Sequence, residues 1–271
     1  MATLGSFTLI KGEADWIAGH LSAWRPHLDQ MVFFDGNSTD GTLEIIKAFQ
    51  KNSDKIKLVE NADPKDLQGD YVRMFDRCMR SLDTDMAIFL HPDMLPARVT
   101  PNWKSWGDDV IAGSVGMRSF AGEPGGPLYE IGGRAQAWKN IYRLNNPDLG
   151  ARYHGHYGAA NEDVYLTSIT GDEYAHHGTN FDRYPYEVVQ SGIEILHFSD
   201  VRTPRRRYER MVSSLMNQGF GEDRARELAV NHPRVTLKDG EGFAFLPAEY
   251  PAEFLDANAK YANLRRMPCY L

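Results

Sequence analysis

The segment Phe33-Phe34-Asp35-Gly36-Asn37-Ser38-Thr39-Asp40-Gly41-Thr42 carries the strongest structural signal in this chain. Its apolar start belongs to a hydrophobic run that predicts a β-strand from Met31 to Asp35, with a carboxylate at the strand end. The polar residues 38–40 are typical of helix N-caps, and they predict a helix through Glu44 to Phe49. A strand followed directly by a capped helix is the beginning of a βαβ unit.

The rest of the first third of the chain alternates in the same way. Further strands are expected at Ser6–Ile10, Ile56–Glu60 and Met86–Leu90, and further helices at Ala14–Trp24 and Leu67–Leu82. This spacing predicts a Rossmann-like α/β core with a mainly parallel, mixed sheet flanked by helices. Ligands of such sheets bind beyond the carboxyl ends of the strands. We therefore expect a site formed by three segments that follow strands: Lys11-Gly12-Glu13, Asp35 and the turn His91-Pro92-Asp93.

The remainder of the chain has a different texture. Residues 110–186 are rich in Gly, Tyr, His and Asn, and strand-like segments occur at Val110–Phe120, Ala135–Leu144 and Ile193–Phe198. Helical patterns return at Pro204–Asn217, Glu222–Asn231 and Ala248–Tyr261. We predict a catalytic domain over residues 1–200 and a helical C-terminal extension, residues 201–271, packed on it.

Composition excludes several classes of protein. The 271 residues carry a net charge of −7, so no overall basic field attracts nucleic acid. No apolar run approaches the roughly 20 residues of a membrane-spanning helix, and the N-terminal residues lack the features of a signal peptide. The two cysteines, Cys78 and Cys269, form no disulfide framework or cysteine-based zinc motif. We predict a cytoplasmic protein without a transmembrane segment.

Two motifs resemble the opening of family-2-type glycosyltransferases of the GT-A fold. Lys11-Gly12-Glu13-Ala14 corresponds to the K-N-E-like turn of that family, with Gly12 in place of the usual Asn, and residues 35–42 match D-x-x-S-T-D-G-T. The resemblance implies a nucleotide-sugar donor, most often a UDP- or GDP-sugar. It also implies that Lys11, Glu13, Asp35 and Asn37 contact this donor, with Glu13 and Asp35 at the base or ribose. A strand followed by a well-capped helix is the simpler explanation of the second motif.

The same resemblance implies a divalent-metal site after the strand Met86–Leu90. The family carries a D-x-D-like signature there, and here His91 replaces the first acidic residue while Asp93 retains the second. A carboxylate at this position would bind Mn²⁺ or Mg²⁺ bridging the donor diphosphate, and imidazole tolerates Mn²⁺ better. Asp83 and Asp85 precede the strand and are expected to be solvated turn residues.

Later segments supply the remaining candidates. His197, in Ile195-Leu196-His197, resembles the metal-binding His that related enzymes carry on a late strand, although a hydrogen-bonded core histidine has the same pattern. Glu162 and Asp163 resemble the acidic motif that inverting relatives use as the catalytic base, and either residue also suits a helix N-cap; Asp172 and Glu173 are rival candidates for the base.

Two arginine-containing segments complete the predicted nucleotide-sugar site. Arg73 lies on the expected helix Leu67–Leu82, whose counterpart in the family often presents an Arg to the nucleotide. Arg205 belongs to the run 202–207, whose guanidinium groups suit a diphosphate. Salt bridges on an exposed helix face, for Arg73, and simple solvation, for the run, are the alternatives.

Together these residues predict a metal-assisted transfer of a sugar to the hydroxyl of a glycan, a lipid-linked or a small-molecule acceptor. The sequence contains no G-x-G-x-x-G after a strand, no P-loop, no H-E-x-x-H and no G-x-S-x-G. A metal-dependent nucleotidyltransferase or hydrolase, and a catalytically silent sugar-nucleotide-binding protein, remain as alternatives.

Overall fold

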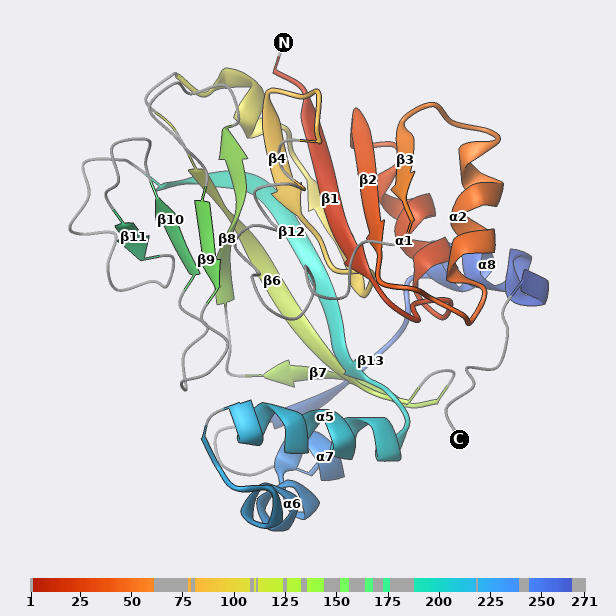
Figure 1. Ribbon diagram of the computed structural model, residues 1–271, viewed down its shortest axis with the longest axis vertical. Helices are drawn as coiled ribbons and strands as arrows, with labels where there is room; N and C mark the ends of the chain where they lie inside the picture. Colours follow the sequence, from red (N-terminus) through yellow and green to blue (C-terminus); the bar gives the residue numbers. More distant parts are fainter. Residues whose placement is uncertain are drawn as a thin grey trace.

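The computed structural model describes most of the N-terminal sheet and the C-terminal helices (Figure 1). The described residues are 2–60, 78, 81–107, 110, 112–123, 126–132, 136–143, 152–155, 164–167, 173–175, 188–217, 219–238 and 244–264. Most of the expected helix Leu67–Leu82 lies outside them, and so do Arg73, Glu162 and Asp163.

The first four strands in chain order, β1 to β4, are parallel to one another, as the sequence predicts. Strand β1 (Leu4–Ile10) lies between β2 (Gln30–Asp35) and β4 (Met86–Phe89), and β3 (Ile56–Val59) pairs with the other edge of β2. Ile10 pairs with Asp35 and Phe7 with Phe89. The carboxyl ends of β1, β2 and β4 therefore lie side by side at one edge of the sheet.

Antiparallel strands extend the sheet beyond β4 and make it mixed. The order of its main path is β13-β7-β6-β8-β4-β1-β2-β3. The added strands on that path are β8 (Gln136–Arg143), β6 (Ala112–Gly122), β7 (Leu128–Gly132) and β13 (Ala244–Ala248). Off the path, the long strand β12 (Val188–Val201) runs parallel to β6 and antiparallel to β5 (Met94–Val99). A separate small sheet contains β9 (Arg152–Gly155), β10 (Val164–Thr167) and β11 (Glu173–Ala175).

Helices flank the parallel half of the sheet. Apolar residues of α1 (Ile17–Trp24) and α2 (Thr42–Gln50) pack on one sheet face, where they form a core with Met31, Phe33 and Ile88. Helix α8 (Ala252–Lys260) packs against α1, and a Cβ at Gly19 would lie only 2.1 Å from the Phe254 ring. Gly19 thus permits the close approach of these two helices.

The other C-terminal helices form a second group near β7 and β13 (Figure 1). It consists of α5 (Pro204–Asn217), α6 (Glu222–Val230) and α7 (Pro233–Thr236), with a small apolar cluster around Val212, Leu215, Ala225 and Ala229. The C-terminal stretch also contributes β13, which pairs with β7 of the main sheet. The domain boundary at residue 200 stays a prediction.

The differences from the sequence prediction have physical causes. The N-cap residue of helix α2 is Gly41, whose φ of 98° suits glycine. Because glycine has no side chain, the N-cap residue itself makes no side-chain hydrogen bond to the helix. Strands β5 and β13 were not predicted, since each contains a proline, Pro96 or Pro247, that argues against a central strand. Both lie at borders of the sheet, where a missing N–H is tolerated.

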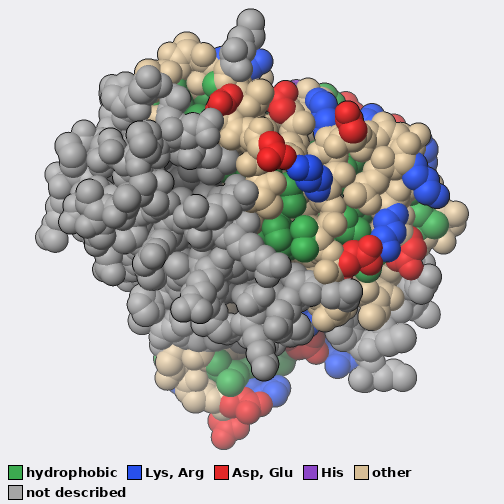
Figure 2. Space-filling model, turned by 45° about the horizontal axis from the view of Figure 1, so that its top comes forward, with side chains coloured by type: hydrophobic (Ala, Val, Ile, Leu, Met, Phe, Trp, Pro, Cys, Tyr) green, Lys and Arg blue, Asp and Glu red, His purple; other side chains and the backbone are tan. Residues whose placement is uncertain are grey.

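The surface matches the mildly acidic composition. Figure 2 shows Lys and Arg side chains intermixed with Asp and Glu side chains over the described part of one face. Among the described helices, none has the length and apolar character needed to cross a membrane.

Candidate active site

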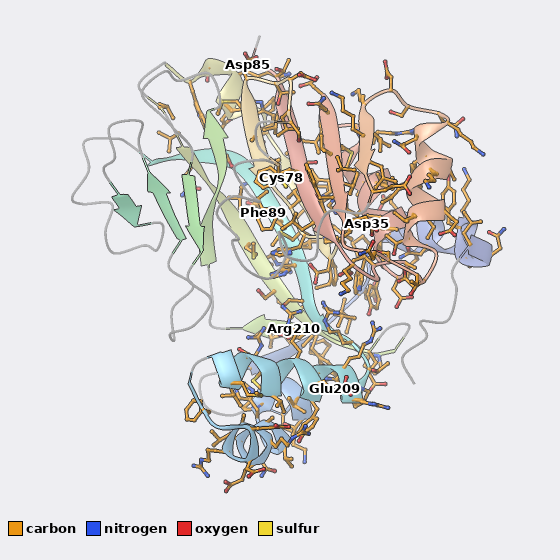
Figure 3. The ribbon with its side chains drawn as sticks, in the orientation of Figure 1. Asp35, Cys78, Asp85, Phe89, Glu209 and Arg210 are labelled. Atoms are coloured by element: carbon orange, nitrogen blue, oxygen red, sulfur yellow. The ribbon has the colours of Figure 1, made fainter. Side chains whose placement is uncertain are left out.

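Asp93 lies in a tight turn at the carboxyl edge of the parallel strands, between β4 and β5. The amide of Met94 donates to the carbonyl of His91 at 3.0 Å, which closes the turn. The amide of Leu90 donates to the carbonyl of Phe7 at 3.2 Å, so the turn begins beside the end of β1. Asp83 and Asp85 lie at the opposite end of β4, as predicted, where they bond to Lys57 and Thr3. Figure 3 shows Asp85 at the top of the sheet and Asp35, at the end of β2, farther down it.

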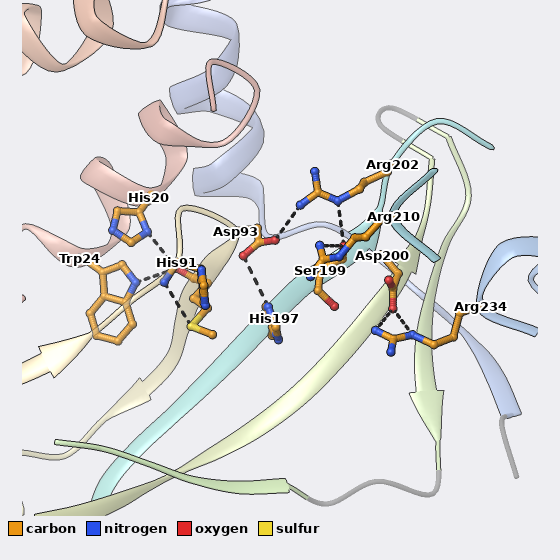
Figure 4. Close-up of polar contacts among 11 residues, drawn as sticks. His20, Trp24, His91, Asp93, His197, Ser199, Asp200, Arg202, Arg210 and Arg234 are labelled. Atoms are coloured by element: carbon orange, nitrogen blue, oxygen red, sulfur yellow. Dashed lines mark hydrogen bonds and ion pairs between the residues drawn. The ribbon is translucent and has the colours of Figure 1, made fainter. Parts of the chain in front are cut away.

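The backbone of this turn is held from two sides. Two buried side chains of α1 meet at the carbonyl oxygen of Met94: Trp24 Nε1 at 2.8 Å and His20 Nδ1 at 3.1 Å (Figure 4). A carbonyl only accepts, so Nδ1 carries the proton in this contact. Burial lowers the pKa of His20 to about 4, which keeps its ring neutral near pH 7. From β12, the amide of Phe198 donates to the carbonyl of Asp93 at 2.9 Å.

The Asp93 side chain contacts His197 and Arg202, and the ring of His91 stacks on that of His197; we call these four residues the Asp93 cluster. Nε2 of His197 lies 3.5 Å from Oδ1 of Asp93, and Nη2 of Arg202 lies 3.4 Å from Oδ2 (Figure 4). The rings of His91 and His197 are stacked, with centroids 6.1 Å apart. Asp93 is only 5% exposed, and its Oδ1 accepts no well-formed hydrogen bond from the described residues. An unsatisfied oxygen of a buried carboxylate is costly, so we look for a ligand that would satisfy it.

The cluster combines an ionised carboxylate with a neutral imidazole. Burial alone would raise the pKa of Asp93, but His197, His91 and Arg202 together hold it below its usual range. Burial lowers the pKa of His91 to about 4, and the opposing effect of Asp93 is smaller. Near pH 7 the side chains of Asp93 and His91 are therefore in the forms that coordinate a cation.

A second carboxyl group, that of Glu13, belongs to the same electrostatic environment. Burial raises its pKa to about 8, and the negative charge of Asp93 contributes to this shift. Arg202 and Arg210 oppose the shift without cancelling it. Because the side chain keeps partial contact with solvent, we expect a mixture of protonated and ionised forms near neutral pH, with the protonated form in excess.

Two arginines bond to the C-terminal part of β12 near Asp93: Arg202, which follows the strand, and Arg210, which lies on α5. Nε of Arg202 and Nη1 of Arg210 both donate to the carbonyl of Ser199, at 3.0 and 2.8 Å. A third, the buried Arg207, donates to the carbonyls of Gly122 and Arg202. Arg207 therefore fixes the backbone from which Arg202 extends. Positive charge is concentrated here beside two carboxyl groups.

The segment 35–42 braces the neighbouring loop. Ser38 Oγ accepts from the amide of Gly12 at 2.9 Å, Thr42 Oγ1 from that of Glu13 at 2.9 Å, and Asp40 Oδ2 from that of Ala14 at 3.0 Å. The N-cap of α2 is Gly41 and not one of the predicted residues 38–40, but Asp40 Oδ1 still accepts from the amide of Thr42, the first residue of the helix, at 3.2 Å. Ser38 and Asp40 in addition bond to the loop after β1. The segment positions the Glu13 backbone.

The remaining predicted residues are more scattered. Asp35 is buried at the end of β2, where its carboxylate accepts a hydrogen bond from the amide of Ser38. In the sheet, β1 lies between β2 and the strand β4 that precedes Asp93. Lys11 and Asn37 are exposed on the loops after β1 and β2. Arg205 is 84% exposed and pairs with Glu209 at 2.7 Å. The structure thus brings Glu13, His91, Asp93 and His197 together and leaves Arg205 apart. The donor-binding and metal roles of all these residues stay predictions.

A divalent cation would fit the Asp93 cluster in part. Oδ1 of Asp93 and Nε2 of His197 are close enough to bind one ion, because two ligands each about 2.1 Å from a metal lie about 3 to 4 Å apart. No group of three His, Cys, Asp or Glu side chains in the described part of the chain is placed to hold a metal ion. A cation here would complete its coordination with phosphate oxygens or water.

Comparisons with known proteins give glycosyltransferases. The chain is similar to glucosyl-3-phosphoglycerate synthase from Mycobacterium tuberculosis, solved with Mn²⁺, uridine diphosphate and glucosyl-3-phosphoglycerate: 17% identity, 44% of each chain, TM-score 0.30. It is similar to the S. aureus protein TarS, residues 1–349: 13% identity, 96% of this chain and 73% of that chain, TM-score 0.38. It is also similar to the galactosyltransferase LgtC, solved with donor and acceptor sugar analogs: 12% identity, 41% of this chain and 46% of that chain, TM-score 0.31.

These solved structures are GT-A glycosyltransferases, the class that the sequence motifs predict. At such identities and TM-scores the likeness carries no argument about ligands or activity, and the chain spans less than half of the synthase and of LgtC. No known family profile and no curated protein matches the sequence.

Three residues that sequence analysis did not assign to the site contribute to it: His20, Trp24 and Arg210. Arg202 also contributes; it belongs to the predicted basic run 202–207, from which only Arg205 was singled out. His20 and Trp24 are four residues apart, so they lie on one helix face and resemble any buried stripe. Arg202 lies in the basic run that contains Arg205, and only the start of α5 at Pro204 separates the two. The run signalled an anion site without showing which guanidinium groups face it.

Proposed function

We propose that this protein is a glycosyltransferase that uses a nucleotide-sugar donor, a UDP- or GDP-sugar, and a divalent cation bound at Asp93. The observation that carries the proposal is the buried, ionised Asp93 at the carboxyl edge of a parallel sheet, whose Oδ1 faces His197 and accepts no well-formed hydrogen bond from the residues that the structure describes. Two arginines and a partly protonated Glu13 beside it suit a diphosphate. The D-x-x-S-T-D-G-T match adds the expectation of a nucleoside site near Asp35 and Asn37.

In this proposal, the donor diphosphate lies between the strand tips and the arginines. Asp93 and His197, with His91 beside them, would hold the cation, which neutralises charge on the leaving diphosphate. Arg202 and Arg210 would neutralise the rest, and a protonated Glu13 would donate a hydrogen bond to an oxygen of the diphosphate.

The reaction breaks the bond between the anomeric carbon and the diphosphate oxygen, and it forms a bond from that carbon to the acceptor oxygen. The proton of the acceptor hydroxyl passes to a base. Glu162 or Asp163, predicted from the sequence, is the candidate for an inverting reaction. Arg73 is a further candidate for contacting the nucleotide, by resemblance alone. The acceptor class and the cytoplasmic location stay sequence predictions.

A thermal-shift panel tests the proposal. UDP-, GDP-, CMP- and dTDP-sugars would be added with and without Mn²⁺ or Mg²⁺, and a true donor should raise the melting temperature with rising concentration. The cation should increase this shift for the wild type but not for Asp93→Ala. The proposal would be contradicted if all four nucleotide sugars raised the melting temperature equally, or if none of them raised it.

A catalytically silent sugar-nucleotide-binding protein is the second candidate. It is favoured by His91 at the first D-x-D position and by the arginine that already contacts Asp93. The two candidates differ in turnover: a transferase releases nucleoside diphosphate from its donor when a suitable acceptor, or water, is present. Saturable donor binding without release, across glycan, lipid-linked and small-molecule acceptors, would favour the silent protein.

A further inference from the structure

The contact between Arg202 and Asp93 raises a question of competition. Arg202 Nη2 lies 3.4 Å from Oδ2, on the same carboxylate whose Oδ1 faces His197. A guanidinium and a divalent cation both draw on the charge of this one carboxylate. Arg202 already pairs with Asp93, so a cation added alone would meet the positive charge of Arg202 at close range.

We propose that Arg202 is an exchangeable counter-ion: it neutralises Asp93 in the ligand-free protein and moves to the diphosphate when cation and donor bind. This inference rests on the proposed function, because it assumes that Asp93 binds a cation and that the adjacent anion is a diphosphate. The consequence is that cation and diphosphate bind strongly only together.

The local structure allows this exchange without a change of the backbone. Arg207 donates to the carbonyl of Arg202 and so holds the main chain at that residue. Arg210 also donates to the Ser199 carbonyl, so this oxygen keeps a partner when the Arg202 side chain leaves it. The Arg202–Asp93 contact itself is long for a charge-assisted hydrogen bond, which is typically about 2.7 to 2.9 Å. Only one side chain needs to move.

Charge balance explains why the two ligands would favour each other. A cation alone leaves Arg202 displaced from Asp93 without an anionic partner, and a diphosphate alone places its negative charge beside Asp93. Bound together, the cation pairs with Asp93 and the diphosphate pairs with Arg202. Such coupling is reciprocal, so each ligand must tighten the other by the same factor.

Isothermal titration calorimetry of the full chain tests this exchange. MnCl₂ and inorganic pyrophosphate would each be titrated alone, and MnCl₂ again in saturating pyrophosphate, for the wild type, Arg202→Met and Arg202→Lys. Arg224→Met is the control, because Arg224 is an exposed arginine of α6 paired with Glu227, away from Asp93. Melting curves check that each variant is folded.

For the wild type we expect pyrophosphate to tighten Mn²⁺ binding at least about tenfold, a coupling of about 1.4 kcal/mol. Arg202→Met should bind Mn²⁺ alone about tenfold more tightly than the wild type, bind pyrophosphate alone more weakly, and show less coupling. Arg202→Lys, which keeps the charge, should stay near the wild type, as should Arg224→Met.

The inference is overturned if Arg202→Met binds Mn²⁺ alone no better than the wild type, or if neither protein binds Mn²⁺. Its failure is separable from that of the proposed function. Specific stabilisation and turnover of a sugar nucleotide with an unchanged Arg202→Met titration would refute the exchange alone. The expected Mn²⁺ and pyrophosphate titrations, with no response to any sugar nucleotide, would refute the transferase and leave the exchange standing.

Discussion

The two sides of the site are held together in opposite ways. On the side of β1 and β2, buried side chains of Asp40 and Thr42 receive hydrogen bonds of 2.6 to 3.2 Å, and the loop carrying Glu13 is fixed by them. On the side of β12, the Asp93 carboxylate has contacts of 3.4 and 3.5 Å with described residues, and among those residues its Oδ1 finds no hydrogen-bond donor. Both carboxylates are buried, yet only that of Asp40 is fully used by the fold. Burial alone therefore does not distinguish a structural carboxylate from a ligand-binding one. A carboxylate oxygen without a hydrogen-bond donor does distinguish them.

Replacing Asp93 should give the largest functional effect. Asp93→Asn keeps the shape but removes the charge, so donor turnover should fall about 10²- to 10³-fold, as for the loss of one electrostatic group in other active sites. The free energy of unfolding should fall less than for Asp40→Ala: the lowered pKa of Asp93 means that its charge stabilises the fold near pH 7, but its side-chain contacts are long. Turnover and urea unfolding measure the two quantities. Asp83→Asn, at the other end of β4, is the control and should leave turnover unchanged.

Replacing Asp40 should have the reverse profile. Asp40→Ala leaves the amide of Ala14 and the hydroxyl of Thr42 without their buried acceptor, which should cost about 2 to 4 kcal/mol of unfolding free energy. Urea unfolding measures the loss, and the exposed Asp54→Ala should change it by less than about 0.5 kcal/mol. Equal destabilisation by Asp93→Asn and Asp40→Ala would show that the two sides do not differ as described.

Glu13 connects the two sides, because its backbone is braced by Thr42 while its carboxyl group responds to Asp93. Its folded pKa of about 8 lies above the ordinary value of 4.5. The unfolded chain therefore releases this proton at lower pH than the folded chain, and stability present below pH 4.5 is lost as the pH rises through about 8.

Glu13→Gln should remove this loss. At pH 9 the variant should exceed the wild type in unfolding free energy by about 2 kcal/mol, a value reduced for the partial solvent exposure of the group. At pH 4 the two proteins should differ little, and that measurement is the internal control. A difference that is the same at both pH values would mean that the Glu13 carboxyl is not perturbed by its surroundings.

The difference between the two sides also explains what the sequence could predict. Apolar runs of four to seven residues identify β1, β2 and β4, and Pro204 correctly marks the start of α5, because these signals are local. Ser38, Asp40 and Thr42 bond to residues 26 to 29 positions earlier, and a local cap accounts for their pattern equally well. Only the register of β1 against β2 brings the two loops together.

Long-range pairing placed the Asp93 side of the site. His197 reaches Asp93 because β12 pairs with β5 in a register that places His197 opposite Met94. The sequence did not predict β5, which contains Pro96. Arg202 and Arg205 lie three residues apart in one basic run, yet Arg202 precedes α5 and faces Asp93, while Arg205 lies in the first turn and pairs along the helix with Glu209. Composition cannot predict which of the two arginines faces Asp93, because this depends on where α5 begins and on the direction in which it leaves β12.

The smallest effect is expected for the two hydrogen bonds that Trp24 and His20 donate to the Met94 carbonyl, which we call the clamp. This test asks whether holding the backbone of the turn also orients the Asp93 side chain. Trp24→Phe removes one of two donors to the Met94 carbonyl, and His20 still satisfies this oxygen, so the loss should be about 1 kcal/mol beyond that of lost packing. Trp103→Phe is the matched control, because Trp103 is equally buried but its Nε1 donates to no acceptor in the described structure. The difference in unfolding free energy between the two variants, measured by urea unfolding, gives the contribution of the hydrogen bond.

If the clamp orients Asp93, Trp24→Phe should also weaken Mn²⁺ binding in saturating pyrophosphate by about two- to fivefold, and Trp103→Phe should not. Equal Mn²⁺ affinities in the two variants would mean that Trp24 only attaches α1 to β5.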